Sequence, residues 1–258
     1  DETVSVTTSD DDTAGFTIVE SDGSTSVAET GTTDTFTVVL TAQPDQDNVV
    51  LTITSSDTGE TTVSGTLTFT AGNWDTPQTV TITGVDDVAV DGTQTSTVTV
   101  SIVDSISDTN FHSVDNQTVS ATTSDNDTAG FTIVESGGST SVDESGTTDT
   151  FTVVLDAQPT SDVVFTITSS DTGEATVSSP LTFTSANWDT PQTVTVTGVN
   201  DGSVVDGNQT STVTVSVNDG SSNDSFDPLS DQTVSVTTTD NDIPGFTVVE
   251  SGGSTSVN

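Results

Sequence analysis

Along most of this chain, apolar residues alternate with threonine or serine. The clearest runs in the first half are residues 35–40, 49–54, 67–70, 79–83 and 96–102. A period of two is typical of β-strands with one buried face, and Val and Thr favour such a pleated surface. Turn-forming residues separate the runs, and no stretch has helical periodicity. The pattern therefore predicts an all-β protein.

The alternating pattern is itself repeated along the chain. The segment AGFTIVES begins at Ala14 and again at Ala129, and the related PGFTVVES begins at Pro244. The segment NWDTPQTVT begins at both Asn73 and Asn187. Such close self-similarity indicates a tandem array of one domain.

The repeat sets the predicted domain boundaries. We predict two complete repeats, at 13–127 and 128–242, with the last strand of a preceding repeat at 1–12 and the first strand of a following repeat at 243–258. About seven short strands per repeat match the size and rhythm of an immunoglobulin-like β-sandwich. Because no linker separates the repeats, we expect the sandwiches to form an extended head-to-tail rod.

The composition of the chain is dominated by uncompensated negative charge. It contains no Lys or Arg, 40 Asp and Glu and one His, for a formal net charge of −40. Nucleic acid and anionic membrane surfaces are poor partners for such a chain. The absence of cysteine excludes disulfides and zinc–thiolate sites. No apolar run is long enough for a membrane helix, so we expect no membrane insertion in this segment.

The acidic residues gather at recurring positions. Acidic triplets at 10–12, 125–127 and 240–242 end each repeat, and further acids lie at 86–91 and 201–206. Ca²⁺ takes about six to eight oxygen ligands from flexible loops, whereas Mg²⁺ needs stricter octahedral geometry. In a chain without cations, these clusters therefore favour calcium. The alternative is that Asp and Asn simply populate turns, where their side chains cap the backbone.

Two stretches of sequence carry a resemblance to a known family. The run DNDTAGF at 125–131, with Glu144 farther on and VDD at 85–87, resembles the Calx-β domain. That domain is named for the calcium-binding regions of sodium–calcium exchangers and also occurs in tandem in large bacterial surface proteins. The segment LTFTSANWDTPQTVTVTG at 181–198 is similar to the bacterial adhesin branch of the family.

The resemblance implies a set of calcium ligands: an early Glu, paired acids of a late loop, an acid beyond them and the terminal triplet. By position, the first site would use Glu29, Asp86, Asp87, Asp91, Asp125 and Asp127, and the second Glu144, Asp201, Asp206, Asp240 and Asp242. Two features depart from the family. Its Gly-Ser-Asp-Tyr loop is missing, with only Asp57 and Asp171 nearby, and Asn200 replaces one paired Asp.

These observations predict a structural role rather than a catalytic one. We expect a calcium-stiffened segment of a secreted bacterial stalk, filament or adhesin at the cell surface. Its expected partners are calcium ions, neighbouring repeats, other copies that assemble into fibres, and a surface or glycan ligand bound elsewhere in the parent protein. A chain without Lys or Arg also lacks trypsin cleavage sites, which suits an exposed fibre.

Two other functions remain open at this point, and we do not expect an enzyme. A regulatory calcium-sensing module of a membrane-associated protein would carry the same ligands, and its calcium affinity would be in the micromolar range rather than about 10⁻⁴–10⁻³ M. General halophilic acidity would explain the total charge without any specific site. An enzyme is disfavoured because His112 is replaced by Asp227 in the other repeat, so no set of catalytic roles is maintained.

Overall fold

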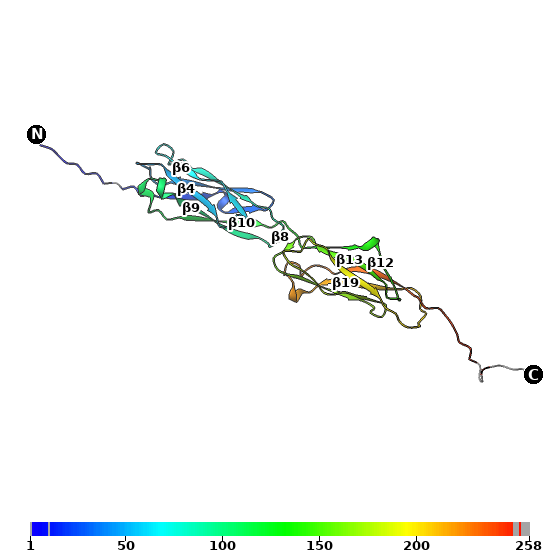
Figure 1. Ribbon diagram of the computed structural model, residues 1–258. Coiled ribbons are helices and arrows are strands. Elements are labelled where there is room, and N and C mark those ends of the chain that lie inside the picture. The colour runs from blue at the N-terminus through cyan, green and yellow to red at the C-terminus, as the bar shows by residue number, and fades with distance from the viewer. Residues whose placement is uncertain (1, 10, 250–252, 254–258) are drawn as a thin grey trace, which may run out of the picture. The chain divides into compact units, whose positions relative to one another are not determined.

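A computed structural model describes residues 2–9, 11–249 and 253 of the chain. The chain divides into two compact units, Asp1–Asp127 and Thr128–Asn258. Figure 1 shows unit 1 in blue to green and unit 2 in green to red. The boundary between the units falls where one sequence repeat gives way to the next.

Unit 1 is a sandwich of two sheets. One sheet has the strand order β1-β3-β7-β5 and the other β2-β10-β9-β4-β6. Neighbouring strands are antiparallel, except that β2 and β10 are parallel. The strands are β1 Phe16–Glu20, β2 Thr25–Ala28, β3 Thr33–Leu40, β4 Val49–Ser55, β5 Thr61–Val63, β6 Leu67–Phe69, β7 Gln78–Gly84, β9 Gln94–Ile102 and β10 Gln117–Ser124, with the short β8 Ala89–Val90 between β7 and β9.

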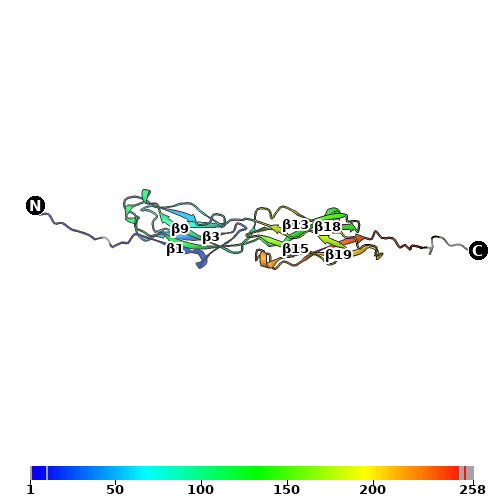
Figure 2. The ribbon, with the colours of Figure 1, turned by 60° about the horizontal axis from the view of Figure 1, so that its bottom comes forward.

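The core of unit 1 lies between the two sheets. Phe36 of β3 and Ile82 of β7 face Leu51 of β4 and Val100 of β9, and all four are completely buried. Figure 2 labels β1 and β3 of one sheet and β9 of the other. The alternate residues on these strands are mainly threonines at the surface. Burying one such apolar side chain contributes roughly 1.5–3 kcal/mol, so the alternation in sequence accounts for the stability of the sandwich.

Unit 2 repeats this architecture. Its sheets have the orders β11-β13-β18-β16 and β12-β20-β19-β15-β17, with β12 and β20 parallel. Phe165 occupies the position of Leu51 and packs edge-on against Phe183, with ring centroids 5.9 Å apart. The strands are β11 Phe131–Glu135, β12 Thr140–Asp143, β13 Thr148–Leu155, β14 Gln158–Pro159, β15 Val163–Ser169, β16 Ala175–Val177, β17 Leu181–Phe183, β18 Gln192–Gly198, β19 Gln209–Val217 and β20 Gln232–Thr239.

The structure confirms the predicted all-β, immunoglobulin-like fold and corrects its details. Within the described residues, the sheets of each sandwich hold nine strands rather than about seven. The additional ones, such as β2 and β5, are only four and three residues long, so they carry little periodicity. The helical elements described are short 3-10 turns: η1 Ser21–Gly23, η2 Asp104–Ile106, η3 Thr109–Phe111, η4 Ser136–Gly138 and η5 Asp219–Ser221.

The described residues of the two terminal segments lie outside the sandwiches. Residues 2–9, 11 and 12 and residues 243–249 and 253 are exposed and form no strand, because no neighbouring strand pairs with them. The rest of the predicted strand segments 1–12 and 243–258 lies outside the described residues, and their assignment to adjacent repeats stays a prediction. Within the part of the chain that the structure describes, no helix is long and apolar enough to cross a membrane.

Candidate metal centres

Several acidic residues of unit 1 meet at one end of its sandwich because of strand register. β10 runs parallel to β2 with Ser124 opposite Ala28, so the residues that follow these strands, Asp125 and Glu29, lie side by side. The amide of Glu29 donates to the carbonyl of Ser124 at 3.1 Å. Antiparallel pairing of β10 with β9 brings the residues before Gln94 to the same end.

Gly84 allows the connection after β7 to join this end of the sandwich. A Cβ atom at Gly84 would clash with the backbone carbonyl of Ala28, which directly precedes Glu29. Glycine is therefore required where β7 passes the end of β2. The chain then continues into Asp86 and Asp87, so these acids enter the loop beside the buried Glu29.

Two overlapping groups of carboxylates form at this end. Oxygen atoms of Glu29, Asp125 and Asp127 lie within 4.8 Å of one another, and so do those of Glu29, Glu60 and Asp91. Glu29 is 1% exposed and Glu60 is 7% exposed. Because Glu29 belongs to both groups, they form one cluster, which we call the unit 1 acidic cluster.

Part of this cluster is held in place by backbone hydrogen bonds. Asp125 Oδ2 accepts from the amides of Asp91 and Gly92 at 3.1 and 2.7 Å, and its Oδ1 accepts from the amide of Asp127 at 2.6 Å. Glu29 Oε2 accepts from the amide of Asn126 at 3.1 Å. These bonds fix the loops that carry the acids, and they leave other carboxylate oxygens without a protein donor.

Four buried oxygens of the cluster have no hydrogen-bond partner. They are Glu29 Oε1, Glu60 Oε2, Asp91 Oδ1 and Asp127 Oδ2. A buried ionised carboxylate is costly unless it is paired or hydrogen-bonded. The chain has no Lys or Arg to pair with them. The cluster therefore requires either protons or a bound cation.

The pKa values of the clustered carboxyl groups are raised, because these groups are buried close to one another without a counter-charge. Burial is the main cause that raises the pKa of Glu60 to about 7, and the negative charges of Asp91 and Glu29 add to it. Burial also raises the pKa values of Glu29, Asp91 and Asp127, again with contributions from neighbouring carboxylates. A cation among these oxygens would remove both the desolvation cost and the repulsion.

Unit 2 contains a matching cluster with one charge fewer in its late loop. Its two groups are Glu144, Asp201 and Asp242, and Glu174, Asp201 and Asp206. Asn200 accepts a hydrogen bond from the amide of Gly202 and carries no charge. The buried carboxylate oxygens of this cluster without a hydrogen-bond partner are Glu144 Oε1, Glu174 Oε2, Asp201 Oδ1 and Asp242 Oδ2, and Asp227 Oδ1 lacks a partner elsewhere in unit 2. We call the five acids of the two groups, with Asp240, the unit 2 acidic cluster.

Most of the predicted ligands belong to the close carboxylate groups, whereas Asp86, Asp87 and Asp240 do not. Glu29, Asp91, Asp125 and Asp127 belong to the close carboxylate groups of unit 1, as do Glu144, Asp201, Asp206 and Asp242 in unit 2. Asp86 and Asp87 are exposed beside the first cluster, where Asp86 accepts from the side-chain amide of Asn126. Asp240 accepts from the amides of Gly207 and Asp242 and anchors its loop.

Sequence reasoning missed Glu60 and Glu174. Both directly precede a short strand, β5 or β16, and both lie three residues beyond the Asp considered in that loop. Asp57 and Asp171 instead accept from the amides of Gly59 and Gly173 and stabilise the turn. Recurrence of the Glu at the same place in both repeats was the available signal. The binding of metal by any of these residues stays a prediction.

Comparison with known proteins gives structural resemblances only. No protein-family model matches the chain, and no curated protein matches it. It is similar to the crystal structure of CBD12 from CALX1.2, with 13% identity, a TM-score of 0.31 and coverage of 78% of each chain. It is also similar to domains 4 and 5 of the S-layer protein SbsC, with 17% identity, a TM-score of 0.32 and coverage of 87% of this chain and 97% of that chain. Resemblances at this level carry no argument about function.

Proposed function

We propose that each unit is a calcium-binding structural module and that the acidic clusters are its ion sites. The observation that carries the proposal is the set of buried carboxylate oxygens without partners, four in each acidic cluster, in a chain that has no cationic side chain besides His112. His112 contacts the carbonyl of Ser107, away from the clusters. A cation from the medium is the counter-charge that remains.

Calcium fits these groups better than other common metals. All the candidate ligands are carboxylate, amide or carbonyl oxygens, since the chain has no cysteine. Ca²⁺ accepts irregular shells of about six to eight oxygens and both mono- and bidentate carboxylates. We assign the ligands of unit 1 to Glu29, Glu60, Asp91, Asp125 and Asp127, with Asp86 and Asp87 beside them. In unit 2 the ligands are Glu144, Glu174, Asp201, Asp206 and Asp242, with Asp240 as the loop anchor.

The proposed biological role is a calcium-stiffened stalk, filament or adhesin segment outside the cell. Asp127, a ligand in unit 1, is followed directly by Thr128, the first residue of unit 2. A cation that fixes residues 125–127 would also restrict the point from which the next repeat begins. The tandem repetition of Calx-β-like modules without linkers supports this role. Identical small-angle scattering profiles with calcium and with EDTA would argue against it.

Calcium binding is tested by titration calorimetry of the whole chain and of two variants. Glu60→Gln removes one buried ligand and is expected to weaken binding in unit 1 by about tenfold, because a charged ligand is lost from a low-dielectric site. Asp75→Asn removes an equal charge from an exposed position outside the cluster and should leave the binding constant unchanged. If the two substitutions weakened calcium binding equally, the binding would reflect the overall negative charge of the chain and not a specific site.

The measured affinity also separates the stalk from a regulatory sensor. Dissociation constants near 10⁻⁴–10⁻³ M are typical of extracellular modules, and values of about 10⁻⁷–10⁻⁵ M are typical of sensors. We expect the weaker range, because several predicted ligands, Asp86, Asp87 and Asp206, are exposed.

A further inference from the structure

A buried serine in each unit has a hydroxyl without a hydrogen-bond partner. On β9 the inward-facing residues include Ser96, Val98 and Val100, and all three are completely buried. Ser96 Oγ has no partner, and neither has Ser211 Oγ at the same place on β19, where the residue is 1% exposed. A buried hydroxyl without a partner costs free energy, so a serine at this position in both units calls for a physical reason.

Strand register places Ser96 behind the unit 1 acidic cluster. On the neighbouring β10, the next inward-facing position towards the cluster is Thr123, whose Oγ1 donates to the carbonyl of Glu60 at 3.4 Å. Thr97, which follows Ser96, exchanges two hydrogen bonds of 2.9 Å with Ser56, where the loop that carries Glu60 begins. The Ser96 hydroxyl therefore faces the interior beneath the loop that carries Glu60.

Unit 2 has the same arrangement around Ser211. Thr238 Oγ1 donates to the carbonyl of Glu174 at 3.4 Å, and Thr212 exchanges two hydrogen bonds with Ser170 at the start of the loop that carries Glu174. In each unit, a serine hydroxyl and the Oε2 atom of a buried Glu are thus left unpartnered at the same end of the sandwich.

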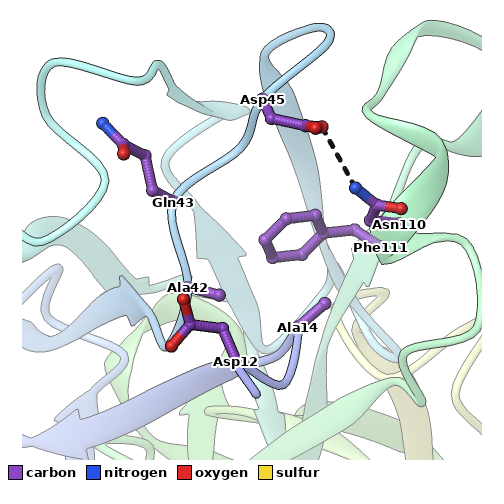
Figure 3. A pocket seen from close by; sticks show the side chains of 7 residues that line it. All are labelled: Asp12, Ala14, Ala42, Gln43, Asp45, Asn110 and Phe111. Carbon is purple, nitrogen blue, oxygen red and sulfur yellow. Dashed lines mark hydrogen bonds between the residues drawn. The ribbon is translucent and has the colours of Figure 1, made fainter. Parts of the chain in front are cut away.

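The opposite end of unit 1, before β10 begins, shows how the chain satisfies buried polar groups by itself. In the pocket beside Phe111, the side chain of Asn110 donates to Asp45 Oδ1 at 3.1 Å (Figure 3). The completely buried Asp108 accepts from the amides of Asp45, Gln46 and Asn110, each at 2.9 Å. The missing partners behind the cluster therefore indicate a group that does not belong to the chain.

We propose that Ser96 and Ser211 each hold a buried water molecule that is the inner ligand of the cation in their cluster. The water oxygen coordinates the cation, and its two protons are donated to the serine Oγ and to the carboxylate of Glu60 or Glu174. Calcium shells of about six to eight oxygens commonly include water, and a buried water typically makes about three such contacts. The inference rests on the proposed calcium binding and adds to it a residue that is not an acid.

Titration calorimetry of S96A/S211A against the parent chain tests the proposal. The double variant changes both units, so the two sites need not be assigned separately. We expect calcium binding to weaken by about tenfold, a typical loss when a group that orients a metal ligand is removed. Ser120→Ala is the matched control, because Ser120 is exposed on β10, and it should bind calcium like the parent chain. Equal affinities of S96A/S211A and the parent chain would overturn the proposal.

Thermal unfolding of the same proteins separates a hydroxyl that holds a ligand from one that is merely unsatisfied. In EDTA, S96A/S211A should melt at or above the temperature of the parent chain, because an unpaired buried polar group is removed. With calcium it should melt lower than the parent chain by about 5 °C, because the cation binds more weakly. A higher melting temperature in both media, or an equally lower one in both, would contradict a role of the serines in cation binding.

The parent chain distinguishes failure of this inference from failure of the proposed function. If the parent chain binds calcium and S96A/S211A binds it equally tightly, the role of the serines is wrong and the calcium sites stand. If the parent chain binds no calcium, both proposals fail.

Discussion

Unit 1 buries carboxylates in two regions, and the two regions differ in how the negative charge is stabilised. Burial raises the pKa of Asp108, but the backbone amides of Gln46, Asn110 and Asp45 outweigh it and lower the pKa to about 2. Glu60 is also buried, yet no amide donates to its Oε2, and its pKa rises to about 7. The protein itself stabilises the first carboxylate as an anion. The second is stable only with a proton or a cation.

This contrast shows that the absence of Lys and Arg does not by itself create a metal site. A buried acid can be satisfied by backbone donors alone, as Asp108 demonstrates. The acidic clusters differ because their loops bring several carboxylates together and supply too few donors for them. Unsatisfied oxygens of several carboxylates that lie close together, rather than total charge, therefore identify the candidate ion sites.

The largest predicted effect concerns the satisfied acid. Asp108→Ala removes the charged acceptor of three backbone amides, those of Asp45, Gln46 and Asn110, and should reduce the free energy of unfolding of unit 1 by roughly 3 kcal/mol or more. Because no cation is involved, the loss should be the same with calcium and with EDTA. Thermal unfolding in both media measures it, and Asp104→Ala, an exposed acid in the same connection, is the control. A loss of stability that appears only with calcium would contradict the difference between Asp108 and the acidic cluster.

Removal of calcium is the next largest effect. At a free calcium concentration about 100 times the dissociation constant, one site adds about 2.7 kcal/mol to stability, which corresponds to a melting temperature roughly 10 °C higher. We expect EDTA to lower the melting temperature by this order, as measured by calorimetry. Magnesium at the same concentration should restore little of it. An unchanged melting temperature in EDTA would show that the clusters bind no calcium.

The pH dependence should have opposite signs in the two regions. The pKa of Glu60 is raised from 4.5 to about 7, so without calcium the folded state holds more protons in this window, and stability falls as the pH rises through it. Asp108 stabilises the fold above its ordinary value of 3.8, and this contribution is lost as the pH falls towards about 2. Thermal melts in EDTA from pH 4 to 8 should show the decline, and saturating calcium should abolish it. Parallel pH profiles in the two media would contradict the assignment.

The smallest predicted effect compares the two clusters. Asn200→Asp restores the paired acid that unit 1 has at Asp86 and should tighten calcium binding by unit 2 a few-fold, because a carboxylate replaces an amide beside the site. Asp86→Asn should make the opposite change in unit 1. Calorimetric titrations of both variants against the parent chain test this symmetry. Similar calcium affinities in the parent chain and both variants would show that Asp86 and Asn200 do not contribute to calcium binding.

The sandwich was predictable because each strand carries its own periodicity, as the alternation through Phe36 and Val38 in β3 illustrates. The grouping of Glu29 with Asp125 came from resemblance to a family, and strand register explains it physically. Glu60 was not predictable in this way. It follows Asp57 in a loop that otherwise contains Ser, Thr and Gly, and its burial arises only when that loop folds across the end of the sandwich.

Asp108 illustrates the same limit on sequence reasoning. Its three amide donors come from two connections that are more than 60 residues apart in sequence, at Asp45 and Asn110. No local pattern distinguishes it from the exposed acids around it. Donors and carboxylates meet through tertiary structure, so sequence shows where acids are numerous, and structure shows which of them lack a partner.

We expect the unpartnered oxygens of the clusters to bind calcium. Anomalous diffraction from crystals grown with Tb³⁺ in place of Ca²⁺ tests it most directly. We expect anomalous peaks within ligand distance of Glu29, Glu60, Asp91 and Asp127 in unit 1 and of the matching acids in unit 2, and none beside Asp108. Water alone among these carboxylates, with millimolar cation in the crystal, would contradict it.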